Sequence, residues 1–214
     1  MKSHVLTIRF HYAENDPRFE WRLEYFKKEV LPRILKQTDQ NFDIAIRCNP
    51  KHAEIFKKLS PKIITFQTKN DEARYKTGKN GKKYFEDFVQ WEDVRGLKKY
   101  DIQSGLDSDD LIGPRYIEAI QEALAGEKEA THICFQPQTF NLKTKRIKPM
   151  MRYHGTRGSA FMSLYQPNKE NYKFIYCGSH ISLWKNAKKS ITLPQGHCWA
   201  TIHDINESTG VKRT

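Results

Sequence analysis

Apolar and polar positions alternate in two different patterns along the first half of the chain. Short apolar runs predict buried strands, and apolar residues three or four positions apart predict amphipathic helices. The expected strands are residues 5–10, 42–48 and 63–66, and the expected helices are residues 21–35 and 49–59. Pro32 should bend or break the first helix near its end. This order of elements predicts an α/β fold with a mainly parallel central sheet flanked by helices.

The pattern is less regular in the rest of the chain. A basic loop at residues 68–83 can be interpreted as an ordinary surface excursion or as a lid over phosphates. The apolar residues from Tyr84 to Val94 have helical spacing and predict a helix that continues to Lys99. The remaining expected elements are a strand that ends at Asp107, helices at residues 115–125 and 180–188, and strands at residues 131–135, 140–142, 147–150, 161–165, 173–176 and 199–206. We therefore expect a mixed or antiparallel C-terminal half.

Three carboxylates, those of Asp107, Asp109 and Asp110, follow a mostly apolar stretch in the middle of the chain. Acids this close together repel one another unless a cation lies among them. Hard ions such as Mg2+ and Mn2+ prefer oxygen ligands, and carboxylates two positions apart at a strand end can share one ion. Asp109 or Asp110 could equally cap the helix that follows. The motif alone leaves both interpretations open.

The predicted sheet brings several polar segments to the same edge. Ligands of such sheets bind beyond the carboxyl ends of the strands. Those ends are expected at residues 9–11, 48–50 and 67–69, and Asp107 lies at a fourth. The acidic cluster should therefore lie beside the end of the first strand.

The composition fits one globular domain over residues 1–214. The chain is 38% hydrophobic and 12% aromatic, which is typical of a folded protein. It has no run of 18 apolar residues, so we expect no membrane-spanning helix. The first residues lack the apolar core of a signal peptide, and the four cysteines show no C-x-x-C spacing. These features predict free thiols in a reducing compartment and a cytoplasmic location.

The formal net charge of +12 favours a polyanionic partner. Nucleic acid, an anionic membrane face and a phosphorylated ligand all satisfy it. Many of the cations occur as Lys-Lys pairs, which are typical of solvated faces, and the basic residues are otherwise scattered. Charge therefore does not identify the partner.

Several groups of residues occur in an order that resembles a known family. They are Thr7-Ile8-Arg9-Phe10, Leu31-Pro32, Gln37-Thr38, Asn41-Phe42, Leu106 to Asp110, and Trp199 with His203 and Asn206. This order, which spans nearly the whole chain, resembles rhamnosyltransferases and related sugar transferases of the GT-A fold. Sugar transferases encoded by large chlorella viruses are similar. One departure is that family members often carry Thr-Arg before Leu-Asp, where this chain has Ser104-Gly105. A donor contact made by that arginine is then missing or supplied elsewhere.

The resemblance implies a single GT-A-like (Rossmann-like) domain, in which residues 1–110 bind the nucleotide sugar and residues 111–214 form the acceptor side. It implies transfer of a glucose- or rhamnose-like sugar from a nucleoside-diphosphate donor, with UDP as the first expectation, to a hydroxyl of a glycan. It also implies Mn2+ or Mg2+, which would stabilise the diphosphate leaving group as the glycosidic bond breaks. If the protein is viral, we expect it in the cytoplasm of the host cell.

The family pattern also assigns metal ligands. Asp109 is expected to bind the ion directly, with His203 as a further ligand. Asp107 should bind the metal through water or contact the donor ribose. A single histidine on a strand is more often structural, so the expectation for His203 depends on the resemblance. Asp110 could orient its neighbours or cap the next helix.

Donor contacts are expected from four further residues. Thr7 and Arg9, at the end of the first strand, should lie near the nucleotide, although Arg9 can also be interpreted as part of a structural ion pair. Arg74 and Lys79, in the basic loop, are expected to reach the diphosphate.

An inverting transfer needs a general base for the acceptor hydroxyl. Asp204, His180 and Glu170 are the candidates, and Asp204 adjoins the expected metal ligand His203. The catalytic expectation is Asp204 or His180.

Two other functions remain open from the sequence. The first is a metal-dependent nucleic-acid enzyme or nucleic-acid-binding protein, which the net charge and the clustered acids favour. Against this function, the sequence has no recognised nucleic-acid-binding motif. The second is a sugar-nucleotide-binding domain without turnover, within a longer multidomain chain.

Overall fold

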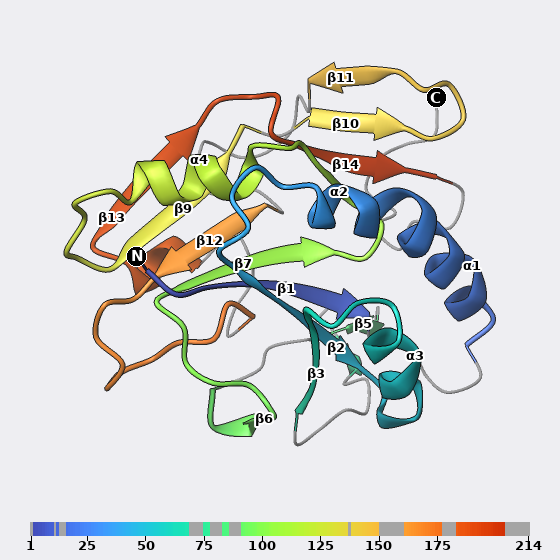
Figure 1. The fold of residues 1–214 in the computed structure, drawn as a ribbon, viewed down its shortest axis with the longest axis horizontal. Helices are drawn as coiled ribbons and strands as arrows, with labels where there is room; N and C mark the ends of the chain where they lie inside the picture. The colour runs from blue at the N-terminus through green and yellow to red at the C-terminus, as the bar shows by residue number, and fades with distance from the viewer. Residues whose placement is uncertain are drawn as a thin grey trace.

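An eight-stranded sheet forms the centre of the molecule (Figure 1). The computed structural model describes residues 2–10, 12, 16–68, 75–77, 83–85, 91–136, 138–149, 161–176 and 183–203. The strand order is β13-β9-β12-β7-β1-β2-β3-β6. The strands are β1 (His4–Phe10), β2 (Asp43–Cys48), β3 (Ile63–Thr68), β6 (Val94–Arg95), β7 (Ile102–Asp107), β9 (Thr131–Phe135), β12 (Met162–Tyr165) and β13 (Lys189–Leu193).

The direction of the strands changes between the two halves of the chain. Strands β7, β1, β2 and β3 are parallel neighbours. Strand β12 then pairs antiparallel with both β7 and β9, and β13 pairs parallel with β9. The prediction of a mainly parallel α/β centre with a mixed C-terminal half is confirmed.

The first helical segment covers one face of this sheet and changes its geometry midway. It consists of α1 (Arg18–Tyr25), a π-helical turn η1 (Phe26–Val30) and α2 (Leu31–Leu35). Pro32 lies in the first turn of α2. Proline has no N–H, and its ring would clash with the carbonyl four residues earlier in a regular helix. The widened turn ends one residue before Leu31, so the expected break appears as a change in the hydrogen-bond pattern.

Two shorter helices complete the parallel units. The 3₁₀ turn η2 (Pro50–His52) leads into α3 (Ala53–Lys57), and the Asn49 side chain accepts a hydrogen bond from the Lys51 N–H at its start. Helix α4 (Tyr116–Ala123) is followed by Gly126 at a φ of 76°. Glycine adopts this left-handed conformation without steric cost, so it allows the chain to turn back toward β9.

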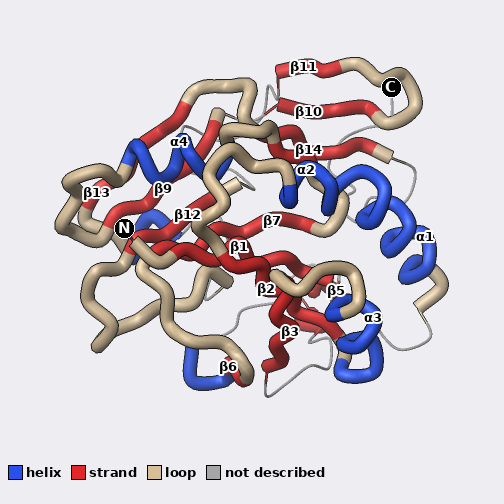
Figure 2. Tube along the Cα trace, in the orientation of Figure 1, coloured by secondary structure: helices blue, strands red, loops and turns tan. Residues whose placement is uncertain are grey.

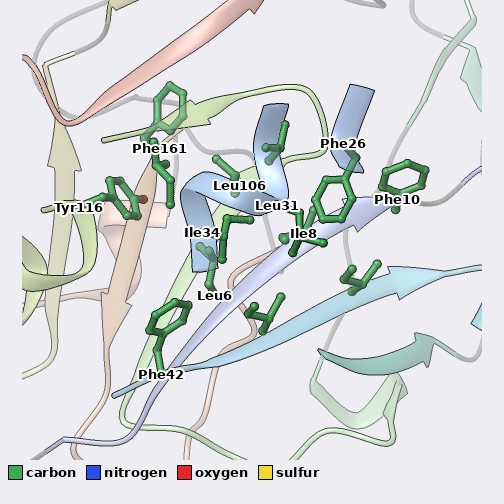
Figure 3. Close-up of a cluster of buried hydrophobic side chains, with 14 of the residues drawn as sticks. Leu6, Ile8, Phe10, Phe26, Leu31, Ile34, Phe42, Leu106, Tyr116 and Phe161 are labelled. Carbon is green, nitrogen blue, oxygen red and sulfur yellow. The ribbon is translucent and has the colours of Figure 1, made fainter. Parts of the chain in front are cut away.

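The core lies between the sheet and the first helical segment (Figure 3). Leu6, Ile8 and Phe10 alternate along β1 toward this face, as the two-residue period of a strand requires. Phe26 and Ile34 reach them from the helix, and all five side chains are fully buried. Other apolar residues of the strands, Val5 and Ala45 among them, pack into a second cluster with Phe174 and Tyr176.

A second, four-stranded sheet brings the C-terminal strand to the acidic turn. Its order is β11-β10-β14-β8. The strands are β8 (Leu111–Ile112), β10 (Gln138–Asn141), β11 (Ile147–Pro149) and β14 (Cys198–Ile202). Strand β14 pairs with β8 directly after the acidic cluster, with Trp199 opposite Leu111. Figure 2 shows β14 running along the α1–α2 segment.

Two predicted elements are wrong. The helix expected to run from residue 84 to residue 99 is interrupted by strands. Strand β5 (Lys83–Phe85) pairs with β4 (Tyr75–Thr77), and a 3₁₀ turn η3 (Trp91–Asp93) leads into β6, which pairs with β3. Gly96, at a φ of 83°, follows β6. Apart from these short strands, the expected lid loop lies outside the described residues.

The strand expected at residues 173–176 is also absent from the described structure. Its backbone groups bond to side-chain amides instead of a neighbouring strand. The Lys173 and Ile175 N–H groups donate to the amide oxygens of Gln166 and Gln103, and both amide nitrogens donate back to the Lys173 carbonyl. Strand β13, at the edge of the large sheet, was not predicted. Of the small helix expected at residues 180–188, the described part is a 3₁₀ turn η4 (Leu183–Asn186).

A membrane-spanning helix was not expected, and the described residues contain no helix that is long and apolar enough to span a bilayer.

Gln37, part of one family-like motif, joins α2 to the segment after the acidic cluster. Its buried side chain donates to the Gly113 carbonyl at 2.7 Å and accepts the Ile117 N–H at 3.1 Å. We expect Gln37→Met to keep the side-chain volume but leave these buried groups short of partners. The expected loss in the free energy of unfolding is roughly 1–3 kcal/mol. Urea denaturation measures it, with Lys36→Met, at the exposed neighbouring position, as the control. Equal stability of the two variants would contradict a structural role for Gln37.

Candidate functional site

The acidic cluster lies at the carboxyl end of β7, beside the end of β1. The register of these parallel strands places Arg9 opposite Asp107. The Arg9 guanidinium donates twice to Asp107 Oδ1, at 2.8 Å from Nε and 2.5 Å from Nη2. The side chains are 34% and 38% exposed, so solvent screens the pair and it adds little to stability. The pair is accessible at the edge where ligands of parallel sheets bind.

Asp109 is held much more deeply than Asp107. Its Oδ2 forms an ion pair with the Arg22 Nη1 from α1, and it lies 2.8 Å from His203 Nε2, just after β14. Only 11% of the Asp109 side chain is exposed, with 5% for Arg22 and 3% for His203. Burial alone would raise the pKa of Asp109. The hydrogen bond from His203 and the charge of Arg22 outweigh burial and hold this pKa below its usual value. Asp109 is therefore a buried carboxylate that stays ionised.

Asp110 has the opposite electrostatic environment. It is buried, and its Oδ1 accepts the backbone N–H of Thr201 at 3.0 Å. Burial, and then the charges of Asp109 and Asp107, raise the pKa of Asp110 well above its usual value. One short turn thus holds two buried carboxyl groups whose pKa values are shifted in opposite directions.

The helix-cap interpretation of these acids is wrong. Helix α4 begins at Tyr116, and Arg115 is its N-cap without a side-chain cap bond. Asp109 instead bonds to Arg22 and His203, and Asp110 bonds to β14. The acids therefore join three distant segments of the chain.

The atoms around Asp109 are compatible with a divalent cation. Neighbouring ligands of an octahedral ion lie about 2.9 Å apart when each metal–ligand bond is about 2.05 Å. The 2.8 Å hydrogen bond between Asp109 Oδ2 and His203 Nε2 is close to that value, and an ion that binds both atoms would have to replace the proton on Nε2. No described residue donates a hydrogen bond to Asp109 Oδ1 or Asp107 Oδ2. Across the described ranges no three His, Cys, Asp or Glu side chains are grouped to hold a metal alone. An ion here would need oxygens from a substrate, as Mg2+ usually does.

Of the other expected donor contacts, the structure describes Thr7 but not the rest. Thr7 is fully buried in β1, and its carbonyl accepts the Tyr176 O–H at 2.8 Å. It therefore lies beneath the site rather than on its surface. The expected donor contacts Arg74 and Lys79 and the expected bases His180 and Asp204 lie outside the described residues.

The third candidate base, Glu170, is not brought to the site. Its neighbour Lys169 pairs with Asp101 at 2.8 Å, and Asp101 precedes β7. The acidic cluster follows β7, whose length is about 20 Å at roughly 3.3 Å per residue. Glu170 is thus at the wrong end of the sheet, and this expectation is wrong.

Arg22 and Trp21 were missed in the sequence. Arg22 lies three residues after Phe19 and four before Phe26, both buried, so it occupies the apolar face of its helix. A cation at a core position was the available signal, because such a charge needs a buried partner. The ring of Trp21 lies 4.7 Å from that of His203 and stacks on Tyr25 at 5.5 Å.

The structure explains why this chain has Ser104-Gly105 where the resemblance implies Thr-Arg. Ser104 Oγ bonds to His4 Nε2 at 2.7 Å and to Ser163 Oγ at 2.6 Å, inside the sheet. A Cβ at Gly105 would lie 3.4 Å from the Tyr176 hydroxyl, so Tyr176 occupies the space of a larger side chain. The Arg9 guanidinium lies 5.2 Å from the centre of the Tyr176 ring. Arg9 therefore lies near the position at which the resemblance implies an arginine.

The electrostatics of Asp110 generate a pH prediction. Because its pKa is raised on folding, its contribution to stability is full below the unfolded pKa of about 3.9 and declines as the pH rises toward the folded value. Asp110→Asn keeps the acceptor for Thr201 but cannot ionise. We expect Asp110→Asn to be more stable than the wild type at pH 8 and about equal to it near pH 3.5. Denaturant unfolding at the two pH values tests this, and a variant that is less stable at pH 8 would contradict it.

The fold is similar to that of S. aureus TarS. The crystal structure of TarS 1–349 in complex with UDP-GlcNAc has a TM-score of 0.59 and 12% identity, covering 99% of this chain and 61% of that one. The complex of the same TarS fragment with UDP has a TM-score of 0.57 and 12% identity, covering 94% and 61%. This chain thus spans about 61% of the length of those TarS chains. No curated protein sequence matches it.

A family model described as "Putative rhamnosyl transferase" matches residues 3–213. The match includes every segment that contributes to the Asp109 site, from Arg22 in α1 to His203 after β14. The chain belongs to this family.

Proposed function

We propose that this protein is a metal-dependent glycosyltransferase that moves a sugar from a nucleoside-diphosphate donor to a hydroxyl of a glycan. The observation that carries the proposal is the Asp107, Asp109 and His203 group at the carboxyl end of the parallel strands. Family membership and the likeness to TarS, whose structures were solved with UDP and UDP-GlcNAc, support it. UDP is the nucleotide we propose, with a glucose- or rhamnose-like sugar.

Asp109 and His203 would hold Mn2+ or Mg2+, and Asp107 would contact the ion through water or bind the donor ribose. The bound cation would supply electrostatic stabilisation to the diphosphate as negative charge accumulates on it. The chain prepares the ligands for this role. Arg22 and His203 fix Asp109 from two sides, so its carboxylate is ionised and oriented before a donor arrives.

Arg9 is the described cation best placed to meet the donor. It is one-third exposed and is held by Asp107 on one side and the Tyr176 ring on the other. A guanidinium can bind phosphate oxygens with two parallel hydrogen bonds. We propose that Arg9 contacts the diphosphate, with Arg74 and Lys79 as further contacts. Arg9 would take the role of the arginine that related proteins often carry where this chain has Gly105.

We propose that residues 111–214, which include the second sheet, form the acceptor side of the site. Asp204 directly follows His203, so it is the general base we propose first, with His180 as the other candidate.

The cysteines support a reducing compartment such as the cytoplasm, because Cys48, Cys134 and Cys198 are buried thiols.

The joint binding of metal and nucleotide tests the proposal. At a ligand concentration of 100 times Kd, binding stabilises the native state by about 2.7 kcal/mol. For a chain of this size that raises Tm by roughly 5–10 °C. We expect UDP with Mn2+ to give such a shift and either alone to give less, and we expect UDP release from a UDP-sugar. A thermal-shift panel of nucleoside diphosphates with and without Mn2+ measures the binding.

Asp109→Asn should abolish the Mn2+-dependent part of the shift. The substitution keeps the shape of the side chain but removes the charge that a divalent ion needs. Asp39→Asn, in a surface turn remote from the cluster, is the control and should respond like the wild type. If Asp109→Asn keeps the full Mn2+-dependent shift, the metal assignment is wrong.

A further inference from the structure

The positive charge of the protein is concentrated in its C-terminal part. Residues 131–214 contain 13 of the 37 Lys and Arg but only 3 of the 25 Asp and Glu, a net charge of +10. Residues 1–130 account for the remaining +2. Between residues 131 and 203 the single acid is Glu170. The view that the basic residues are scattered is therefore wrong for this part of the chain.

In this C-terminal part, most of the described cations outside the β10–β11 hairpin have acidic partners from residues 1–130. Lys169 pairs with Asp101, Lys188 with Glu129, and Lys189 with Glu127. These pairs neutralise the end of the sheet that lies away from the candidate site.

The turn of the β10–β11 hairpin holds a dense group of cations without acidic partners among the described residues. Four exposed cations lie within six positions: Lys143, Lys145, Arg146 and Lys148. None of them pairs with an acid of the described chain. The strands of the second sheet, β8, β10, β11 and β14, contain no Asp or Glu. The hairpin therefore presents a local positive field that described acids do not cancel.

This basic turn lies beside the candidate site. Strand β10 runs parallel to β14, with Asn141 opposite Ile202. The Leu142 N–H donates to the Ile202 carbonyl at 3.0 Å, and His203 is the next residue. In Figure 1 the turn between β10 and β11 lies at the same end of the second sheet as the end of β14. A ligand on the hairpin turn would thus be next to the segment that holds Asp109.

We propose that the β10–β11 hairpin binds an acidic glycan, one that carries carboxylate or phosphate groups, and guides it as acceptor to the site. The inference rests on the proposed function and specifies its acceptor. A cluster of cations attracts polyanions over roughly a Debye length, about 8 Å at physiological salt. Placed beside the site, it raises the local concentration of a charged acceptor.

Other polyanions fit the hairpin less well. Stable attachment to a membrane needs buried apolar area in addition to charge. Ile147, 51% exposed, is the one large apolar side chain that the hairpin exposes. Specific binding of duplex nucleic acid needs contacts across a large surface, on the order of 1,000 Å2 or more, and this hairpin turn is short. A flexible acidic chain needs only the turn and the adjoining site.

Neutralising the hairpin tests the proposal in the full chain. The variant is Lys143→Gln, Lys145→Asn, Arg146→Gln and Lys148→Gln together. Asn is chosen because Lys145 has a φ of 56°, a conformation that asparagine tolerates. The matched control removes three exposed lysines and one arginine elsewhere: Arg33→Gln, Lys36→Gln, Lys58→Gln and Lys128→Gln.

The probe is fluorescein-labelled oligogalacturonate, with a neutral maltooligosaccharide of equal length as reference. At 50 mM salt we expect the wild type and the control to bind the acidic probe with similar Kd, and the hairpin variant to bind about tenfold or more weakly with a smaller salt dependence. Anisotropy measures each Kd. Absence of binding, equal binding of the two probes, or equal loss in both variants would overturn the inference.

Two further measurements separate this inference from the proposed function. The UDP and Mn2+ thermal shift should be the same in the hairpin variant and the wild type, which also shows that the variant is folded. If the wild type gives that shift but no hairpin-dependent binding of the acidic probe, the acceptor inference fails and the donor proposal stands. A 20-base-pair DNA or phosphatidylglycerol vesicles that displace the probe at lower charge concentration than unlabelled oligogalacturonate would assign the hairpin to that partner and overturn the proposal.

Discussion

The buried charge of Asp109 is the constraint on which the site depends. An ionised carboxylate removed from water is costly unless charged and hydrogen-bonded partners surround it. Arg22 and His203 meet this requirement, and they come from a helix near the start of the chain and from the end of β14. The same requirement fixes the neighbouring elements. The short β8 strand after the acids pairs with β14, and the Thr201 N–H is bound by Asp110. One carboxylate thus sets where three separate segments meet.

The surrounding electrostatics divide the acidic cluster into three different groups. Asp107 is accessible and paired with Arg9, Asp109 is buried with a lowered pKa, and Asp110 is buried with a raised pKa. Had all three been ionised in one turn, their repulsion would oppose folding. The raised pKa of Asp110 reduces this repulsion, while Arg22 and His203 favour the charged form of Asp109. The difference follows from burial and partners, because the three residues are the same amino acid.

The sequence predicted the parallel half of the fold well and the rest less well. Strands β1, β2, β3 and β7 are short buried runs with local signals, so periodicity located them. The failures have non-local causes. The amide side chains of Gln103 and Gln166 satisfy the backbone at residues 173–175, and three of the apolar residues from Tyr84 to Val94 belong to paired strands. Within the site, the clustered acids at a strand end pointed to Asp107 and Asp109, and the family resemblance added His203. Arg22 was not, because its partner is far away in sequence and its position on the apolar face of its helix was the only local signal.

The pairing of β14 with β8 has a consequence for folding. His203 lies 94 residues after Asp109, and Thr201 lies 91 residues after Asp110. Contacts of such long sequence separation form late, since a large loop must close before they are made. While a nascent chain still lacks β14, two aspartates would stand unshielded beside a single guanidinium. The buried charge of Asp109 would therefore gain its second partner only after β14 has docked.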